Sequence, residues 1–405
     1  MNAFSFIVEL IILSKLSVAS MFQSFITLVI LIFGFLSFSL NALTLGAERA
    51  GDYLSALKGK RVGLIVNQTS RVAEQHLVDF LIKQGVDVKK VFAPEHGFRG
   101  NQDAGAQVED ERDVKTGLPI ISLYGKNKKP KADQLKDIDI LIFDIQDVGV
   151  RFYTYISTMH LAMEAASDIG IEFWVFDRPN PNLNYIDGPV LEKPFRSFVG
   201  MHPIPILHGM TVGELALMIS GEGWLVSSNK LRLRVVSMLQ YSSATQYKIP
   251  IPPSPNLPNQ RAIYLYPSLC FFEATPVSVG RGTDFPFQVF GYSNPKLGKF
   301  NFTPKPVIGA ASNPKLNGVI AYGEDLRDSS VRGFDLTWFI AAYQQFSHEG
   351  VEFFQSPSFM DKLAGTDKVR KAMEAGLTAS EIRTLWQQDV QRFIKLREQY
   401  LLYPR

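Results

Sequence analysis

The chain has 405 residues, of which 46% are hydrophobic and 20% are charged, a composition typical of a globular protein long enough for two domains. Its formal net charge of +3 is too small to indicate nucleic-acid binding, and the basic run GKNKKPK at residues 125–131 is typical of a solvated loop. The single cysteine, Cys270, excludes an internal disulfide and a metal cage built from thiolates.

The first 47 residues indicate export. Residues 16–47 carry no charged side chain, and within them an apolar run begins at Phe25, with Lys15 before it and small residues from Ala42 onward. This order is typical of a cleaved signal peptide, which places the mature chain in the periplasm or outside the cell. The run is also long enough to span a bilayer, so an uncleaved anchor is the alternative. Translation could also start at Met21.

Behind this segment, continuous apolar runs alternate with helical patterns. The apolar runs predict buried strands at residues 61–68, 86–94, 118–125, 137–145, 171–177 and 231–238. Apolar spacing and end signals predict helices at residues 72–85, 153–170 and 211–220. Apolar strands that alternate with helices are typical of a parallel sheet covered on both faces, so we predict an α/β fold with a Rossmann-like sheet.

The composition changes at residues 248–261, where five prolines exclude a helix interior and a central strand. We interpret this segment as the domain junction. It divides a Rossmann-like catalytic domain, residues 48–258, from a smaller α+β auxiliary domain, residues 259–405. The last 70 residues predict helices, including a long final helix that starts at a capping box of Thr378 and Glu381.

Polar residues follow four of the predicted strands at the point where each strand ends. They are residues 67–70, then Glu95 and His96, then Asp144, Gln146, Asp147 and Arg151, and finally Asp177, Arg178 and Asn180. Because right-handed crossovers place the carboxyl ends of parallel strands on one edge, we expect these clusters to share a ligand-binding rim. The alternative is that Asp144 and Asp177 only cap strand ends and pair with the two arginines.

Several carboxylates gathered on one rim suit acid–base chemistry. Like charges raise the pKa of a neighbouring carboxyl group, so that one carboxylic acid can stay protonated beside an ionised one, as glycoside hydrolysis requires. An arginine on the same rim can hold a substrate carboxylate through two parallel hydrogen bonds. Glu95 is the strongest single candidate, because His96 and Gly97 behind it predict a sharp turn.

Other motifs are absent or ambiguous. The sequence contains no GxGxxG, P-loop, GxSxG or HExxH pattern, so we expect neither a nucleotide cofactor nor a metal. His160 and Glu164 share a helix face, which indicates a structural pair rather than a metal site. His208 either faces the cleft or caps the helix that starts at Thr211.

The second domain offers one polar group in a glycine-containing loop between apolar runs. It consists of Glu273, Arg281 and Asp284. These residues either form an ion pair on the surface or line the opposite wall of an interdomain cleft, which is a favoured place for pockets.

Six ordered segments carry a family signature. They are APEHGFRG, DIQDVGVRFYTY, DRPNPN, HGMTVGELA, PSPNLPN and FEATPVSVGRGT. Together they resemble the NamZ-type exo-β-N-acetylmuramidases, a family long catalogued as a domain of unknown function. The resemblance implies a Rossmann-like domain, a smaller C-terminal domain and a cleft between them. It also implies exo-acting release of N-acetylmuramic acid, whose lactyl carboxylate suits an arginine, from the non-reducing ends of peptidoglycan fragments.

These observations assign hypothetical roles. Glu95 is expected to be the general acid, oriented by His96, and Asp147 or Asp144 the base or nucleophile. The residues expected to bind sugar are Arg151, Tyr155, Asp177, Arg178, Asn180, Asn256, Glu273 and Arg281. We expect muramyl saccharides as partners, no nucleic acid, no cofactor, and membrane contact only through an uncleaved N-terminal segment. The alternatives are a non-catalytic peptidoglycan-binding protein and a metal-dependent hydrolase that uses the three strand-end acids.

Overall fold

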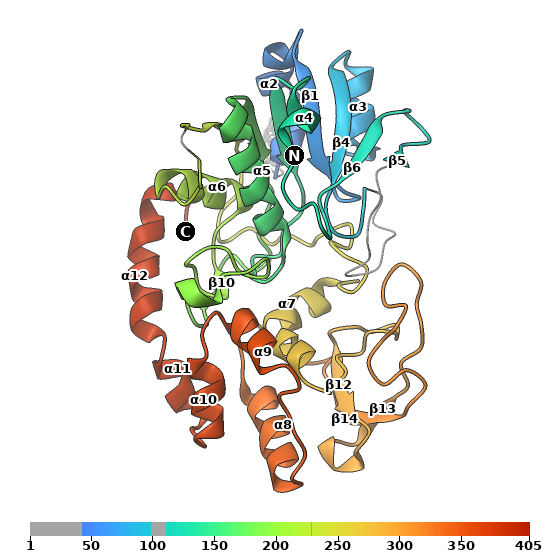
Figure 1. Cartoon of the computed structure of the whole chain (residues 1–405), viewed down its shortest axis with the longest axis vertical. Helices are drawn as coiled ribbons and strands as arrows, with labels where there is room; N and C mark the ends of the chain where they lie inside the picture. The colour runs from blue at the N-terminus through green and yellow to red at the C-terminus, as the bar shows by residue number, and fades with distance from the viewer. Residues whose placement is uncertain (1–42, 99–110, 228) are drawn as a thin grey trace, which may run out of the picture. The chain divides into compact units, whose positions relative to one another are not determined.

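The structure is a computed structural model, and the residues that it describes are 43–98, 111–227 and 229–405. Within them, the part from Thr44 to Arg405 forms one compact unit (Figure 1). Most of the predicted leader lies outside the described residues. No helix among the described residues is long and apolar enough to cross a membrane.

The compact unit begins before Ala47, the last residue of the predicted leader. Thr44 pairs with Leu239 in an isolated antiparallel bridge, and the backbone N–H of Gly46 donates to the carbonyl oxygen of Asp177 at 3.0 Å. Ala47 itself is completely buried. These residues therefore belong to the folded molecule.

Within the described residues, the main sheet has seven strands in the order β11-β8-β7-β1-β4-β6-β5. They are β1 (Arg61–Val66), β4 (Asp87–Ala93), β5 (Glu111–Arg112), β6 (Pro119–Ser122), β7 (Ile140–Asp144), β8 (Glu172–Phe176) and β11 (Arg232–Val236). Neighbouring strands are parallel except that β5 pairs antiparallel with β6 at the edge. Without β5, this is the Rossmann order, which reverses between β1 and β7, and the predicted fold class is confirmed.

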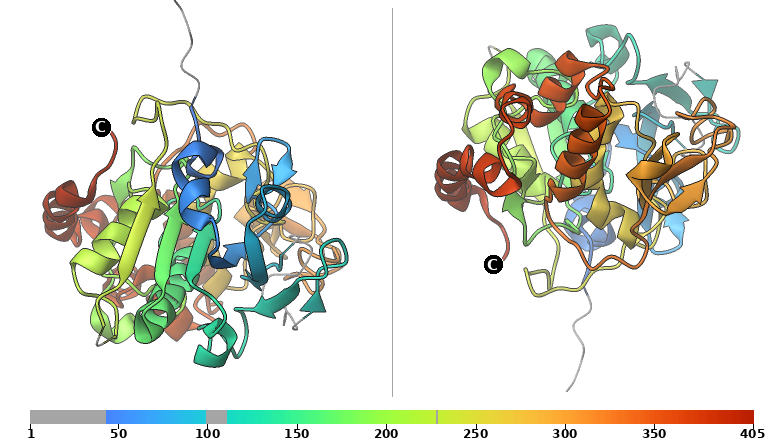
Figure 2. Two further views of the ribbon diagram at one scale, coloured as in Figure 1. Left: turned by 90° about the horizontal axis from the view of Figure 1, so that it is seen from above. Right: turned by 90° about the horizontal axis from the view of Figure 1, so that it is seen from below.

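Helices cover both faces of the sheet. They are α2 (Ala50–Leu57) and α3 (Leu77–Lys83) on one face, and α5 (Tyr155–Ile169) and α6 (Val212–Gly221) on the other. In the view from above, α2 lies in front of the strands (Figure 2, left). Strand β7 is buried on both sides, because Ile142 packs in the same cluster as Tyr53 of α2, whereas Phe143 packs in the same cluster as Met159 of α5. This double burial explains why the strand is apolar at every position from Ile140 to Phe143.

One predicted helix starts later than its sequence pattern indicates. Residues 72–76 were expected to open the helix, but they belong to a short hairpin. Its strands are β2 (Arg71–Val72) and β3 (Gln75–His76). Ala73 has a φ of 48°, which no right-handed helix allows, and the imidazole of His76 accepts a hydrogen bond from the N–H of Val78 at 3.2 Å. The helix therefore begins at this histidine cap.

The long final helix predicted from the sequence is divided. Its parts are α11 (Ala379–Thr384), α12 (Gln387–Arg397) and the 3-10 turn η5 (Glu398–Tyr400). Trp386 stands at the break with a φ of −121°, and its buried indole N–H donates to Asp187 at 2.9 Å. This tertiary contact overrides the helical pattern. The predicted capping box of Thr378 and Glu381 is confirmed.

The C-terminal part mixes helices with a small antiparallel sheet of order β12-β14-β13. Its elements are α7 (Gln260–Leu269), η3 (Cys270–Ala274), β12 (Val289–Tyr292), η4 (Pro295–Leu297), β13 (Phe300–Phe302), β14 (Ala321–Asp325), α8 (Thr337–His348), α9 (Pro357–Ala364) and α10 (Lys368–Glu374). The remaining short elements are η1 (Gly46–Glu48), α4 (Ala132–Leu135), β9 (Ile186–Asp187), η2 (Lys193–Phe195) and β10 (Leu207–His208).

One hydrophobic cluster continues from the large sheet into the C-terminal helices. It contains Phe143 of β7, Phe152 before α5, Phe271 of η3 and Phe339 of α8. All four side chains are 3% exposed or less, so the two parts share a core rather than meeting at a wet interface.

Candidate active site

A cavity of about 350 Å³ lies where the carboxyl end of β4 and the start of α5 meet α7 and η3. This volume is in the range of small-molecule sites. The predicted site residues that line it are Glu95, His96, Tyr155, Asn256, Glu273 and Arg281. The cavity therefore brings together residues from both sides of the proline-rich segment.

Glu95 is positioned by a tight turn directly after β4. The N–H of Gly97 donates to the carbonyl oxygen of Pro94 at 3.0 Å, and both His96 and Gly97 adopt left-handed conformations, with φ of 68° and 76°. For a histidine this conformation costs roughly 1 kcal/mol, and such strain is typical of functional sites. The predicted sharp turn at the Glu-His pair is confirmed.

Hydroxyl groups surround Glu95. Thr154, immediately before α5, donates from its Oγ1 to Oε2 of Glu95 at 2.8 Å. The Tyr155 hydroxyl donates to the carbonyl oxygens of Glu95 and Pro253 at 3.4 and 3.3 Å. Burial, followed by the negative charge of Glu95, raises the pKa of both Tyr124 and Tyr155 well above the usual tyrosine range. These hydroxyls are therefore hydrogen-bond donors at every physiological pH.

The second carboxylate of the cavity, Glu273, has a different partner. Nε of Arg281 lies 2.8 Å from its Oε1, and the guanidinium carbon stands 5.0 Å from the centre of the Phe287 ring. Lys315 reinforces this wall by donating to three backbone carbonyls, including that of Glu273 at 3.0 Å. Burial alone would raise the pKa of Glu273, but the charges of Arg281 and Lys315 lower it below its ordinary value. Glu273 is therefore ionised at neutral pH.

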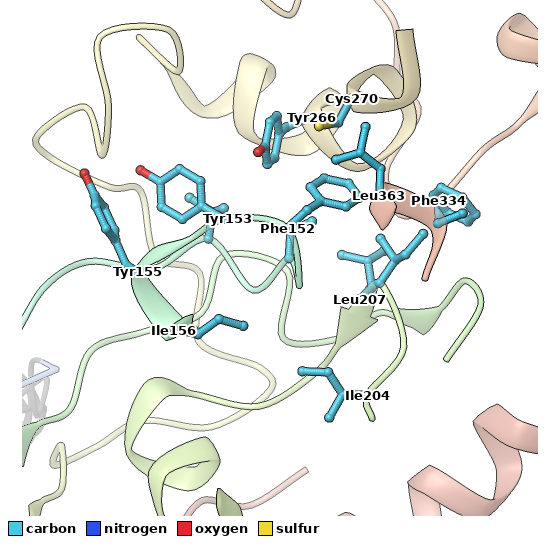
Figure 3. Close-up of a cluster of buried hydrophobic side chains, with 14 of the residues drawn as sticks. Phe152, Tyr153, Tyr155, Ile156, Ile204, Leu207, Tyr266, Cys270, Phe334 and Leu363 are labelled. Carbon is cyan, nitrogen blue, oxygen red and sulfur yellow. The ribbon is translucent and has the colours of Figure 1, made fainter. Parts of the chain in front are cut away.

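Aromatic rings form one side of the cavity. Tyr266 of α7 lies above Phe152 and Tyr153, next to Cys270 (Figure 3). The Phe152 and Tyr266 rings pack edge to face, with centroids 5.4 Å apart. Burial raises the pKa of the Cys270 thiol, so it is a packing group here and not a nucleophile. Such a wall suits the apolar face of a sugar ring.

Asp144 does not line this cavity. Its two carboxylate oxygens lie 2.5 and 2.9 Å from Nε and Nη2 of Arg178, and both side chains are buried. Arg178 is thereby committed to a bidentate ion pair, although it also borders a separate cavity. Asp144 is therefore a strand-end residue that pairs with an arginine, which is the alternative that the sequence left open.

Asp177 caps a helix instead of binding an arginine. It accepts hydrogen bonds from the hydroxyls of Thr211 at 2.7 Å and Tyr403 at 2.5 Å, and from the N–H of Gly213 at 2.8 Å. Burial raises its pKa to about 6. Asp177 therefore fixes the start of α6, away from the cavity.

Arg151 and Asn180 hold loops together. Arg151 donates to four buried carbonyl oxygens at 2.6 to 2.9 Å, and these belong to Pro189, Ile204, Leu363 and Ala364. Asn180 donates to Met210 and accepts from the N–H of Asn182. Neither side chain lines the cavity, so both are structural residues of the surrounding frame.

Asp147 lies beneath the cavity without lining it. Its Oδ2 accepts from the N–H of Gly149 at 2.6 Å, whereas Oδ1 is buried without a partner among the described residues. Burial raises the pKa of Asp147 to about 7, and its charge acts on Tyr153 and Tyr155 above it. Of the residues predicted to share one rim, Glu95 and His96 therefore line the cavity, whereas the three aspartates are buried in polar contacts away from it.

The histidine motifs also have buried positions. His160 lies 3.0 Å from Glu164 and 3.1 Å from His202, so the predicted structural pair extends into a buried network. His208 accepts from the N–H of Met210, and burial lowers its pKa to about 3. Among the described residues, no group of three or more histidines, cysteines and acids is placed to hold a metal ion.

Sequence reasoning missed several residues that line the cavity. They are Tyr124, Lys128, Thr154, Ser254 and Tyr266. Tyr124 lies at the end of the third predicted strand, so the same strand-end rule could have found it. Tyr266 comes from α7, and only the packing of the C-terminal part against the sheet places it here.

Comparisons with known proteins agree over nearly the whole described chain. Residues 62–261 match the family model "Exo-beta-N-acetylmuramidase NamZ, N-terminal", and residues 264–403 match the corresponding C-terminal model. The chain is 40% identical over 373 residues to the peptidoglycan beta-N-acetylmuramidase NamZ of Bacillus subtilis (strain 168), covering 87% of this chain and 89% of that protein.

Two crystal structures of DUF1343 family proteins from Bacteroides fragilis NCTC 9343 are also similar. One is 46% identical with a TM-score of 0.82, covering 90% of this chain and 99% of that one. The other is 31% identical with a TM-score of 0.76, covering 89% and 99%.

Proposed function

Because the chain belongs to the exo-β-N-acetylmuramidase NamZ family, we propose that it is a glycosidase that releases N-acetylmuramic acid from the non-reducing ends of peptidoglycan fragments. The observation that carries the assignment is the pair of carboxylates in one cavity, Glu95 and Glu273. Their different partners, a hydroxyl and a guanidinium, suit two different roles in glycoside hydrolysis.

The reaction breaks the bond between C1 of the muramic acid and the oxygen of the next sugar. Glu95 gives its proton to this leaving oxygen, and a water molecule supplies the hydroxyl group to C1 and a proton to the site. The ionised Glu273 stabilises the positive charge that develops at C1 and the ring oxygen in the transition state. Tyr155 and Thr154 hold Glu95 in place.

Replacing Glu95 by glutamine tests the acid role. On the natural disaccharide, Glu95→Gln should lower kcat by on the order of a hundredfold or more, because the leaving oxygen then departs without its proton. For a chromogenic muramide with an activated leaving group, kcat should fall less, because that group departs without being protonated. Glu324→Gln, an exposed control on β14, should retain full activity.

An undiminished rate of Glu95→Gln on the disaccharide would exclude the acid role. Wild-type protein that binds the disaccharide without turnover would indicate the non-catalytic alternative. Loss of all wild-type activity in EDTA would indicate the metal-dependent alternative.

We further propose that the N-terminal segment exports the protein. The uncharged apolar run from Phe25 supports this, and the folded contacts of Thr44 and Gly46 limit where a leader can be removed. N-terminal sequencing of the secreted or periplasmic protein should give a chain that begins after Met21 and no later than Thr44. A chain that starts at Met1 or Met21 would instead indicate an uncleaved anchor.

A further inference from the structure

Lys128 lines the active-site cavity and has no role in the chemistry above. Its Nζ lies 4.4 Å from the centre of the Phe198 ring, and within the described residues no ion pair involves it. The side chain is half-buried, whereas Lys126 in the same loop is exposed. The sequence predicts a solvated loop here, and within that loop Lys128 is less exposed than Lys126.

Neighbouring contacts fix the loop so that Lys128 stays at the cavity. Lys129 turns to the opposite side, where its Nζ lies 2.9 Å from Asp168 and 3.3 Å from Glu164 on α5. Phe198, the ring beneath the Lys128 ammonium, packs against Tyr124 with centroids 6.3 Å apart. The ammonium group is therefore held by an aromatic platform.

The two cations of the cavity differ in whether an acid pairs with them. Among the described residues, its cationic side chains are Arg281 and Lys128. The charge of Arg281 is offset by Glu273 at 2.8 Å, whereas Lys128 faces the cavity without such an acid. A partly desolvated ammonium without a counter-ion attracts an anionic group of the ligand.

We propose that Lys128 binds the lactyl carboxylate of N-acetylmuramic acid and selects this sugar over N-acetylglucosamine, which lacks that group. The assignment rests on the hydrolysis proposed above. It also replaces the arginines that the sequence suggested for this carboxylate, because Arg151 and Arg178 bind other groups. Lys128 acts on substrate binding and not on proton transfer.

A thermodynamic cycle that combines a change in the protein with a change in the substrate tests this role. Its substrates are 4-nitrophenyl N-acetyl-β-muramide and the methyl ester of its lactyl group, which differ only in the negative charge. Lys128→Met should lower kcat/KM for the acid by roughly tenfold to a hundredfold, mainly through KM. The ester should lose a similar factor with wild-type protein and little more with Lys128→Met, because the two changes remove the same contact.

The controls separate binding from folding. Lys126→Met, the same change on the exposed side of the loop, should leave kcat/KM for the acid unchanged, and Lys128→Arg should restore part of the loss. Equal losses of Lys128→Met on acid and ester would overturn the proposal, and so would a kcat/KM for the acid equal to that of Lys126→Met.

Calorimetric binding of free N-acetylmuramic acid separates this inference from the proposed function. If wild-type protein hydrolyses neither substrate, the proposed function fails. Binding that is weakened by Lys128→Met and not by Lys126→Met would still support the role of Lys128. Binding that is equal in wild type and Lys128→Met, or absent from wild type, would overturn it.

Discussion

Acidic residues that look alike in the sequence differ in the structure in their burial and in their partners. The sequence groups Asp144, Asp147 and Glu95 on one rim, but Asp144 is held by Arg178 and Asp147 is sealed in the interior. Only Glu95 of these three reaches the cavity, where Glu273 joins it from the C-terminal part. Burial and partners, which no sequence pattern states, decide which acid can meet a substrate.

Asp147 should make stability depend on pH. Its pKa is raised to about 7 by burial, whereas in the unfolded chain it is about 3.9. The native state therefore keeps a proton that the unfolded state releases, and this contribution to stability declines as pH rises from about 4 to 7. Asp147→Asn should remove the decline and stabilise the protein at pH 8 by on the order of a few kcal/mol, with little gain at pH 4.

Urea unfolding of wild type and Asp147→Asn at pH 4, 6 and 8 measures this effect. The exposed Asp328→Asn serves as the matched control and should follow wild type. Equal free energies of unfolding of Asp147→Asn and wild type at pH 8 would show that burying the ionised Asp147 carboxylate does not destabilise the native state. A loss of activity as large as that of Glu95→Gln would return Asp147 to the catalytic pair.

At the scale of elements, the strands follow their sequence patterns more closely than the helices do. The central strands are apolar on both faces, so their limits can be read from the run itself. The starts of α3 and α12 depend on His76 and Trp386, whose side chains also contact Asn67 and Asp187 outside these helices. Helical spacing does not contain that information.

The segment that follows η5 at the end of the chain returns to the edge of the large sheet. The Tyr403 hydroxyl accepts from the N–H of Met238 at 2.9 Å and donates to the buried Asp177 at 2.5 Å. Tyr403→Phe should destabilise the protein by about 1 to 3 kcal/mol, because it leaves both partners buried without this bond. Thermal and urea unfolding measure the loss.

Tyr400→Phe is the matched control, because its hydroxyl bonds the carboxylate of Glu222 at 2.6 Å in a more exposed place. It should cost less than about 1 kcal/mol. Both variants should keep the wild-type KM, since neither residue lines the cavity. A Tyr403→Phe protein as stable as wild type would show that the chain end does not secure the sheet edge.

At the scale of the whole molecule, the candidate active-site cavity exists because two parts of the chain share one core. The Rossmann-like sheet supplies Glu95, and η3 supplies Glu273. The hydrophobic cluster that includes Phe143 and Phe339 holds these parts together. The four hydrogen bonds of Arg151 add to this, because two of them reach Leu363 and Ala364 in the C-terminal part. The sequence predicts that Arg151 binds sugar, but in the structure it holds together the loops around the cavity.

The sequence by itself determined the fold class, the family resemblance and the sharp turn at the Glu-His pair after β4. Apolar periodicity, turn residues and ordered motifs are local properties, and they survive without knowledge of distant contacts. Only the tertiary structure decided which strand-end residues are sealed, which acid faces Glu95, and that Lys128 borders the cavity. Those outcomes depend on burial and on pairs far apart in the chain, which are set when the two parts pack together.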